Sequence, residues 1–103
     1  DQPIPLADAV HMLTQKAART VGLHDRGVLR PGYKADINVI DLARLALHIP
    51  HIVHDLPGGG RRLDQAATGY DATIVSGQVI RRFDAPTDAL PGRLVRGAQP
   101  VPA

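Results

Sequence analysis

The chain lacks cysteine and tryptophan, and each absence excludes a class of site. Without a thiol it can form no disulfide, no thiolate zinc site and no cysteine nucleophile. The aromatic residues are one Phe and two Tyr, which is too few for a surface that stacks nucleic-acid bases. Six arginines come in pairs, and we interpret them as solvated or inter-domain ion-pairing side chains. They are Arg61, Arg62, Arg81, Arg82, Arg93 and Arg96.

Long apolar runs are missing as well. No stretch approaches the roughly 18 residues of a membrane span, and the amino terminus lacks the basic and apolar regions of a signal peptide. The formal net charge is only +2, which gives too weak a field to attract nucleic acid or an anionic membrane. We therefore expect a soluble, cytoplasmic protein that has neither nucleic acid nor membrane as a partner.

The length limits the chain to one modest core. It has 103 residues, of which 27 are Leu, Ile or Val, and this excludes a complete large enzyme. The sequence begins at Asp1 without an initiator Met. We interpret it as an internal piece of a longer protein.

Apolar residues at helical spacing characterise the beginning of the chain. They recur every three or four positions and so line one face of a helix. These residues are Leu6, Val10, Leu13, Ala17 and Val21. Pro5 suits the first helical turn, and Gly22 suits the left-handed position after the last turn. The pattern predicts a helix over residues 6–20.

Short strands with turn residues between them follow the helix. Pro31 and Gly32 fit the two central positions of a type II turn, because Pro presets φ and Gly accepts a positive φ. We expect strands at 37–40, 70–75 and 78–82, the last two joined by a Ser76-Gly77 turn. The strand content of residues 42–56 stays open, and the prolines after residue 82 favour an extended strap with a loose end. The fold class is therefore α+β, one amphipathic helix followed by a small, mainly antiparallel sheet.

Three histidines are the alternative candidates for a zinc site. His48, His51 and His54 are three residues apart, a spacing that can converge on one metal if the backbone turns helically. Pro50 opposes a helix, and in an extended chain His51 points away from the other two. We favour surface histidines over metal ligands.

Two further motifs have a structural interpretation. Asp36 and Asp41 bracket the strand 37–40 at an odd spacing, which places them on opposite faces and does not suit an acid–base pair. We expect Asp36 to accept backbone N–H groups of the Pro31-Gly32 turn. Residues 58–62 could hold a phosphate, but they lack the ending of a phosphate-binding loop, and we favour a flexible turn. No catalytic set of acid, base and nucleophile is found.

The order of the motifs resembles the amidohydrolase superfamily. The carboxy-terminal signature of that superfamily is similar to TQKAARTVGL (14–23) followed by DRGVLRPGYKADINVID (25–41). A narrower resemblance is to its N-acyl-D-amino-acid deacylase (D-aminoacylase) branch. The segments similar to that branch are HDLPGG (54–59), ATIVSG (72–77) and ALPGRLVRG (89–97). The chain departs from the pattern at Phe83-Asp84-Ala85, where relatives tend to have Gly after the acidic residue, so the turn geometry there stays open.

The resemblance implies a TIM barrel that carries a β-sandwich built from both chain ends. Residues 1–24 would be the last barrel helix, 25–97 the carboxy-terminal part of the sandwich and 98–103 a flexible tail. The family's zinc ligands and catalytic Asp come from upstream barrel strands, so none of them maps onto this sequence. The implied reaction is hydrolysis of an N-acyl-D-amino acid, or a related amide, by metal-activated water.

The resemblance also implies partners for the chain. We expect this chain alone to be inactive and to bind no cofactor, with zinc held by the parent enzyme. Its partners would be the missing amino-terminal strands and the barrel of the parent chain, or a second copy through self-association of exposed apolar faces. The alternative is a stand-alone, non-catalytic binding or assembly module.

Overall fold

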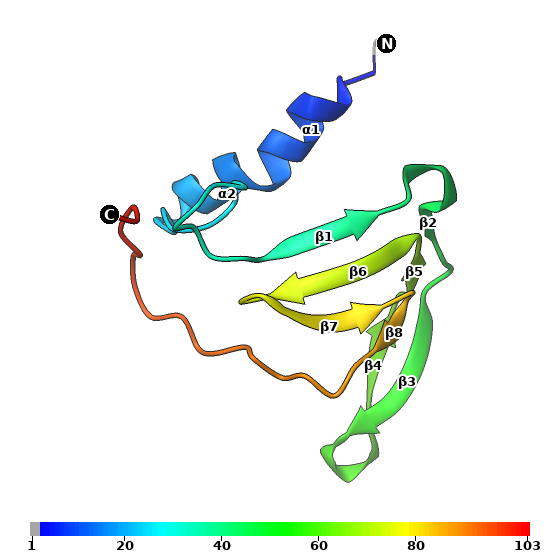
Figure 1. The fold of residues 1–103 in the computed structure, drawn as a ribbon. Helices are drawn as coiled ribbons and strands as arrows, with labels where there is room; N and C mark the ends of the chain where they lie inside the picture. Colours follow the sequence, from blue (N-terminus) through cyan, green and yellow to red (C-terminus); the bar gives the residue numbers. More distant parts are fainter. Residues whose placement is uncertain (1–2) are drawn as a thin grey trace. The chain divides into compact units, whose positions relative to one another are not determined.

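The computed structural model describes residues 3–103 and has the predicted α+β fold. Two short helices, α1 (Leu6–Leu13) and α2 (Gln15–Thr20), precede the strands (Figure 1). The strands are β1 (Ile37–Ile40), β2 (Ala46–Leu47), β3 (His51–Leu56), β4 (Gly60–Asp64), β5 (Ala67–Thr68), β6 (Tyr70–Val75), β7 (Gln78–Arg82) and β8 (Ala85–Pro86). Single 3-10 turns cover Leu42–Arg44 and Pro57–Gly59. Within the described residues, no helix has the length and apolar character needed to cross a membrane.

The chain forms two units, which we describe separately. The first contains the residues up to Ile37 together with Ile74–Gln78 and Leu90–Ala103. The second contains Asn38–Thr73 and Val79–Ala89. The boundaries expected from the sequence, after residues 24 and 97, stay a prediction.

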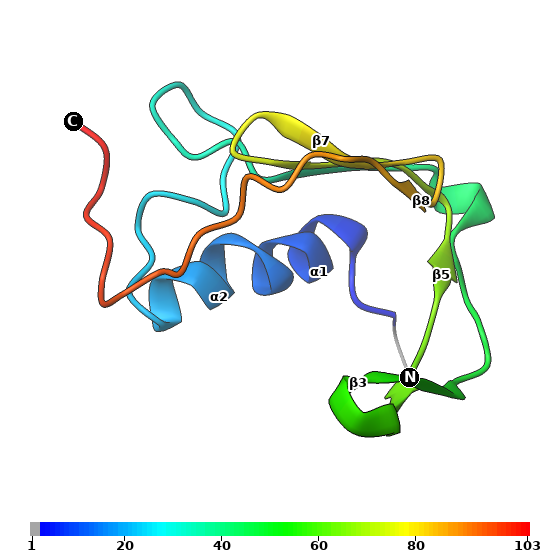
Figure 2. The ribbon, with the colours of Figure 1, turned by 90° about the horizontal axis from the view of Figure 1, so that it is seen from below.

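The predicted helix of the first unit forms, with an interruption at Thr14. This residue has φ −120° and ψ −92°, and its hydroxyl donates to the carbonyl of Val10 at 2.7 Å. Such a side-chain bond competes with the helical backbone ladder. The following loop also approaches here, because a Cβ on Gly27 would lie 3.0 Å from the carbonyl oxygen of Thr14. Figure 2 shows α1 and α2 in succession on either side of this break.

The type II turn predicted at Pro31 and Gly32 is present. The N–H of Tyr33 donates to the carbonyl of Arg30 at 3.1 Å, and Gly32 has φ +89°. These are the hydrogen bond and the positive φ that a type II turn requires. The sequence prediction of this turn is therefore confirmed.

The carboxy-terminal strap returns to the loop after α2 (Figure 2). The N–H of His24 donates to the carbonyl of Gln99 at 2.9 Å, and the N–H of Gln99 donates to the carbonyl of Gly22 at 2.8 Å. Leu23 and Gln99 form a parallel bridge through these bonds. Residue 99 is thus held by backbone hydrogen bonds, although the sequence placed it in a flexible tail.

A four-stranded sheet has the order β1-β6-β7-β8. Its first three strands have the bounds predicted from the sequence. Ser76 and Gly77, at φ 51° and 79°, form the expected two-residue turn between β6 and β7. The next turn, between β7 and β8, consists of Phe83 and Asp84 at φ 48° and 66°. Two non-glycine residues therefore occupy left-handed positions where the family pattern left the geometry open.

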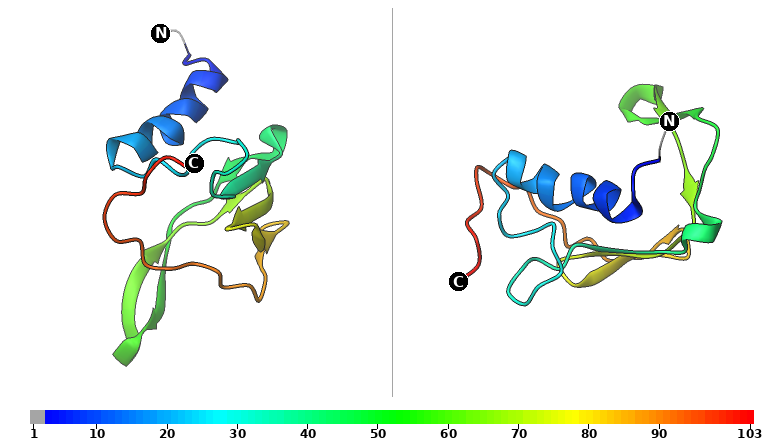
Figure 3. Two further views of the ribbon diagram at one scale, coloured as in Figure 1. Left: turned by 60° about the vertical axis from the view of Figure 1, so that its left-hand side comes forward. Right: turned by 90° about the horizontal axis from the view of Figure 1, so that it is seen from above.

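The stretch whose strand content stayed open contains β2 and β3. β2 pairs with β5, and β3 pairs with β4 in an antiparallel hairpin. In this hairpin His51 lies opposite Asp64 and Val53 opposite Arg62. Figure 3 shows β3 and β4 as a two-stranded ribbon that ends in the turn at Pro57–Gly59. The glycine-rich segment is therefore a turn, and β4 begins at its last glycine.

Residues 3–103 bury no apolar side chain. The predicted helical stripe is open to solvent, with Leu6 58%, Val10 51% and Leu13 81% exposed. On the β3–β4 hairpin, Ile52 is 57% and Leu63 68% exposed. Exposed apolar faces of this extent are typical of interaction surfaces, because a partner that covers them removes apolar area from water.

Candidate functional site

The three histidines named as alternative zinc ligands have different surroundings. His48 follows β2, and its Nε2 lies 3.2 Å from Oγ1 of Thr68. His51 and His54 both lie in β3, but the pairing of β3 with β4 is irregular after Val53, so His54 lies outside the regular register that contains His51. Within residues 3–103, no group of three or more His, Cys, Asp or Glu side chains could hold a metal ion. The structure therefore does not bring these three histidines together as a set of metal ligands.

Asp36 has partners other than the turn that the sequence indicated. Its Oδ1 accepts the N–H of Ser76 at 3.0 Å and the ammonium of Lys34 at 2.6 Å. The N–H of Gly77 adds a bond to the carbonyl of Ala35 at 3.0 Å. Asp36 therefore fixes the β6–β7 turn beside the residues that lead into β1.

The pKa of Asp36 reflects two opposing effects. Partial burial raises the pKa of its carboxyl, whereas the hydrogen bonds from Lys34 and Ser76 lower it, and the net pKa lies below the ordinary value. Asp36 is therefore an anion at neutral pH. Its charge is compensated within the fold by Lys34.

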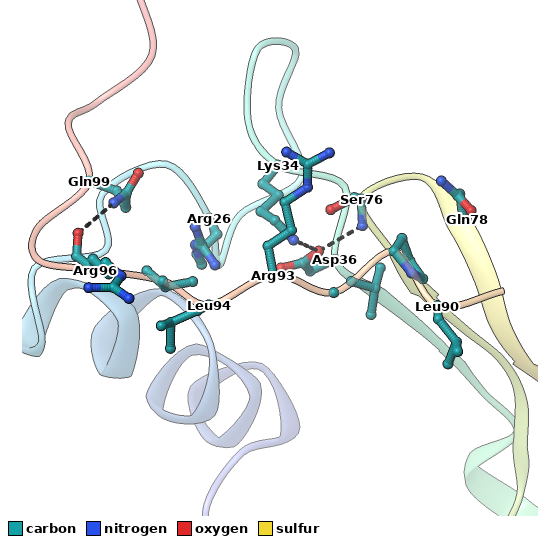
Figure 4. Close-up of a pocket in the computed structure, with 14 residues that line it drawn as sticks. Arg26, Lys34, Asp36, Ser76, Gln78, Leu90, Arg93, Leu94, Arg96 and Gln99 are labelled. Carbon is teal, nitrogen blue, oxygen red and sulfur yellow. Dashed lines mark hydrogen bonds and ion pairs between the residues drawn. The ribbon is translucent and has the colours of Figure 1, made fainter.

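A groove of about 710 Å³ surrounds Asp36 in the first unit (Figure 4). Four of its lining residues carry a positive charge, and Asp36 is the one carboxylate among them. The cations are Arg26, Lys34, Arg93 and Arg96. Ser76, Gln78 and Gln99 add polar groups to the lining, and the strap residues 90–96 form one side of the groove. The volume lies in the range of small-molecule sites.

Arg26 is one of the cations whose charge is already paired. Its Nε and Nη2 donate to the two carboxylate oxygens of Asp25 at 2.9 and 3.3 Å. This hydrogen bonding raises the pKa of Arg26 and lowers the pKa of Asp25. Asp25 and Asp36 thus each hold one cation of the groove.

The lining of the groove contains no histidine and no cysteine. A nucleophile such as the Ser76 hydroxyl would need an adjacent base, and the one carboxylate present is already bonded to Lys34. The groove therefore presents cationic and polar side chains without an activated nucleophile. Sequence reasoning identified Arg93 and Arg96 only as a pair of arginines, because their approach to Arg26 and Lys34 depends on the return of the strap.

Arg62 organises a second charged cluster on the β3–β4 hairpin. Its guanidinium makes two hydrogen bonds to Asp55, at 2.8 and 2.6 Å, and one to Asp64 at 3.3 Å. These bonds lower the pKa of Asp55 and raise the pKa of Arg62. All three side chains are exposed, so the cluster ties the two strands together without forming a closed site.

Asp84 is a structural residue that sequence reasoning missed. It lies at φ 66°, and its carboxylate accepts the N–H groups of Gly69 and Tyr70 at 3.3 and 3.1 Å. The same turn donates the N–H of Phe83 to the carbonyl of Asp71 at 2.9 Å. Asp tolerates a left-handed conformation better than most residues, and this preference is the sequence feature that could have indicated its place in the turn.

The chain is similar to a protein family and to known proteins named as a deacylase and as deaminases. Residues 1–81 match the model of the Amidohydrolase family. The chain is 35% identical over 97 residues to an N-acyl-D-aspartate deacylase of Alcaligenes xylosoxydans xylosoxydans, which covers 85% of the chain and 18% of that protein. No solved structure matches the chain.

Two deaminases are also similar. The 5-methylthioadenosine/S-adenosylhomocysteine deaminase of Desulfitobacterium hafniense is 37% identical over 59 residues, which is 50% of the chain and 14% of that protein. The protein of the same name from Pelotomaculum thermopropionicum is 35% identical over 79 residues, 75% of the chain and 17% of its own length. The chain thus spans 14 to 18% of the length of these relatives.

Proposed function

Since the chain belongs to the Amidohydrolase family, we propose that it is the carboxy-terminal structural segment of a zinc-dependent hydrolase of amide C–N bonds. The family match over residues 1–81 carries the proposal. In this proposal the zinc ligands and the catalytic carboxylate belong to a part of the parent enzyme outside these 103 residues.

The proposed substrates are N-acyl-D-amino acids. Similarity to the N-acyl-D-aspartate deacylase extends over 97 residues, further than the similarity to the deaminases named above. The segments 54–59 and 89–97 also resemble the D-aminoacylase branch. In the parent, zinc would activate water for attack on the acyl carbonyl, and a carboxylate would transfer the proton to the leaving amine.

The proposed role of this chain is to cover the barrel and complete a sheet. β1 lies at an edge of the four-stranded sheet, with Val39 47% and Ile40 43% exposed. Such an edge pairs readily with another strand. We assign the amino-terminal strands and the barrel of the parent as the partners of this edge and of the stripe formed by Leu6, Val10 and Leu13.

The test compares the complete gene product that contains this chain with the 103-residue chain alone. Both are assayed for release of D-aspartate from N-acetyl-D-aspartate, with the L-enantiomer as the matched control. We expect hydrolysis of the D-enantiomer by the complete product only, loss of activity with a chelator and recovery with zinc. Zinc-dependent hydrolysis by the short chain would show that the chain is not merely structural.

Deamination is the second candidate activity of the parent. It is favoured by the identity of 35 to 37% to the two deaminases. Release of ammonia from 5-methylthioadenosine or S-adenosylhomocysteine, measured beside the deacylase assay, distinguishes the two. Ammonia release without hydrolysis of N-acetyl-D-aspartate would assign the parent to the deaminases. Absence of both activities would favour the stand-alone binding or assembly module.

A further inference from the structure

The positive charge of the groove around Asp36 exceeds what the fold itself neutralises. Four cations line the groove beside one carboxylate. Lys34 is paired with Asp36 at 2.6 Å, and Arg26 is paired with Asp25 at 2.9 Å. Arg93 and Arg96, the other two cations, form no ion pair with the described residues 3–103. The groove is thus left with the charge of two guanidinium groups.

The two ion pairs also hold Lys34 and Arg26, two of the cations that line the groove, in place. The side chains of Lys34 and Asp36 are 26% and 32% exposed, and those of Arg26 and Asp25 are 17% and 24% exposed. Side chains that are partly buried and paired lose little further freedom when a ligand arrives. Figure 4 shows Lys34, Asp36 and Ser76 joined by hydrogen bonds, with Arg93 of the strap beside them.

Charge and size together define the ligand. A guanidinium binds phosphate and carboxylate oxygens through parallel N–H bonds. The volume of about 710 Å³ admits a small molecule, and the lining adds the polar side chains of Ser76, Gln78 and Gln99. A cation would meet the repulsion of Arg93 and Arg96, and Asp36 is already bonded to Lys34.

We propose that the groove lined by Arg26, Lys34, Arg93 and Arg96 binds a small oxyanion of the phosphate or carboxylate class, with Arg93 as its principal charged contact. This inference does not rest on the amide hydrolysis proposed above. The strap forms one side of the site. Anion binding therefore stabilises the strap against the other residues of the first unit.

The test is a calorimetric titration of the complete gene product with inorganic phosphate and, in a second arm, with succinate. A chelator is present throughout, so that phosphate cannot bind through a metal ion. We expect saturable binding that Arg93→Ala weakens by about tenfold, because a charge-assisted bond of this kind is lost. Increasing chloride also weakens the binding, since the lining is partly open to salt.

Arg61→Ala is the matched control, because Arg61 is an exposed arginine of β4 in the second unit. It should leave the affinity unchanged. Arg93→Lys keeps the charge but loses the planar fork, and we expect an intermediate affinity. Binding of both anions supports an oxyanion site of broad chemistry, and binding of one identifies the class. Absence of saturable binding, or equal weakening by Arg93→Ala and Arg61→Ala, would overturn the proposal.

Discussion

Replacement of Asp36 should loosen the β6–β7 turn in a graded way. In the structure one carboxylate oxygen accepts both the N–H of Ser76 and the ammonium of Lys34. A hydrogen bond to a charged group contributes about 1.5 to 3 kcal/mol. Because Asp36 is 32% exposed, we use the lower end of that range, about 1.5 kcal/mol, for loss of the acceptor in Asp36→Ala. Asp36→Asn keeps a neutral acceptor oxygen and should lose about 0.7 kcal/mol.

Hydrogen exchange of the Ser76 amide measures this loss directly. Since 1.4 kcal/mol is a factor of ten, Asp36→Ala should exchange about tenfold faster and Asp36→Asn about threefold faster than the unchanged protein. The measurement is mass spectrometry of peptides containing Ser76 from the complete gene product. Asp88→Ala is the control, because Asp88 is exposed and its side chain has no hydrogen bond to residues 3–103. Equal exchange in Asp36→Ala and Asp88→Ala would refute the reasoning.

Three further predictions concern pH, packing and metal content. The folded pKa of Asp36 lies below its ordinary value of 3.8, so the ionised carboxylate stabilises the folded protein fully above that pH and loses this effect as the pH falls through the folded pKa. The difference in melting temperature between the unchanged protein and Asp36→Asn should therefore shrink below about pH 3.8. A difference that stays constant with pH would contradict this. Gly69→Ala should destabilise the protein by about 3 kcal/mol in thermal unfolding, because Gly69 has φ +100° and the added Cβ would lie 2.6 Å from Cα of Leu45. The control Gly92→Ala should have little effect, because a Cβ there has no atom within 4 Å. Combined replacement of His48, His51 and His54 by Ala should leave the zinc content of the complete gene product unchanged by elemental analysis, and a loss of zinc would assign these residues to a metal site.

The elements that the sequence predicted correctly are those with local causes. The β6–β7 hairpin follows from β-branched strands and a turn whose residues accept positive φ, and β1 follows from an apolar run after the turn at Gly32. The apolar stripe predicted the helix but not its break at Thr14, where the loop at Gly27 approaches closely. A periodic pattern carries no information about such a contact.

The features that the sequence did not predict depend on long-range pairing. The β3–β4 hairpin has a turn of Pro57 and glycines, which favours neither of the common two-residue hairpin turns, and its register follows from pairs such as His51 with Asp64. The groove likewise combines residues of a loop, a turn and the strap. The sequence identified Asp36 as structural, but its partner Ser76 lies 40 positions away, beyond the reach of local turn rules.

The bridge between Leu23 and Gln99 limits which sequence changes the strap can accept. Both of its hydrogen bonds join backbone groups, so they require a backbone N–H at position 99 but no particular side chain. Any residue except proline can supply that group. The strap therefore tolerates wide substitution at this point but not a change in its length, because an insertion before residue 99 would move a different residue into the bridge. Among homologues, we expect gaps to be rarer than substitutions between residues 89 and 99.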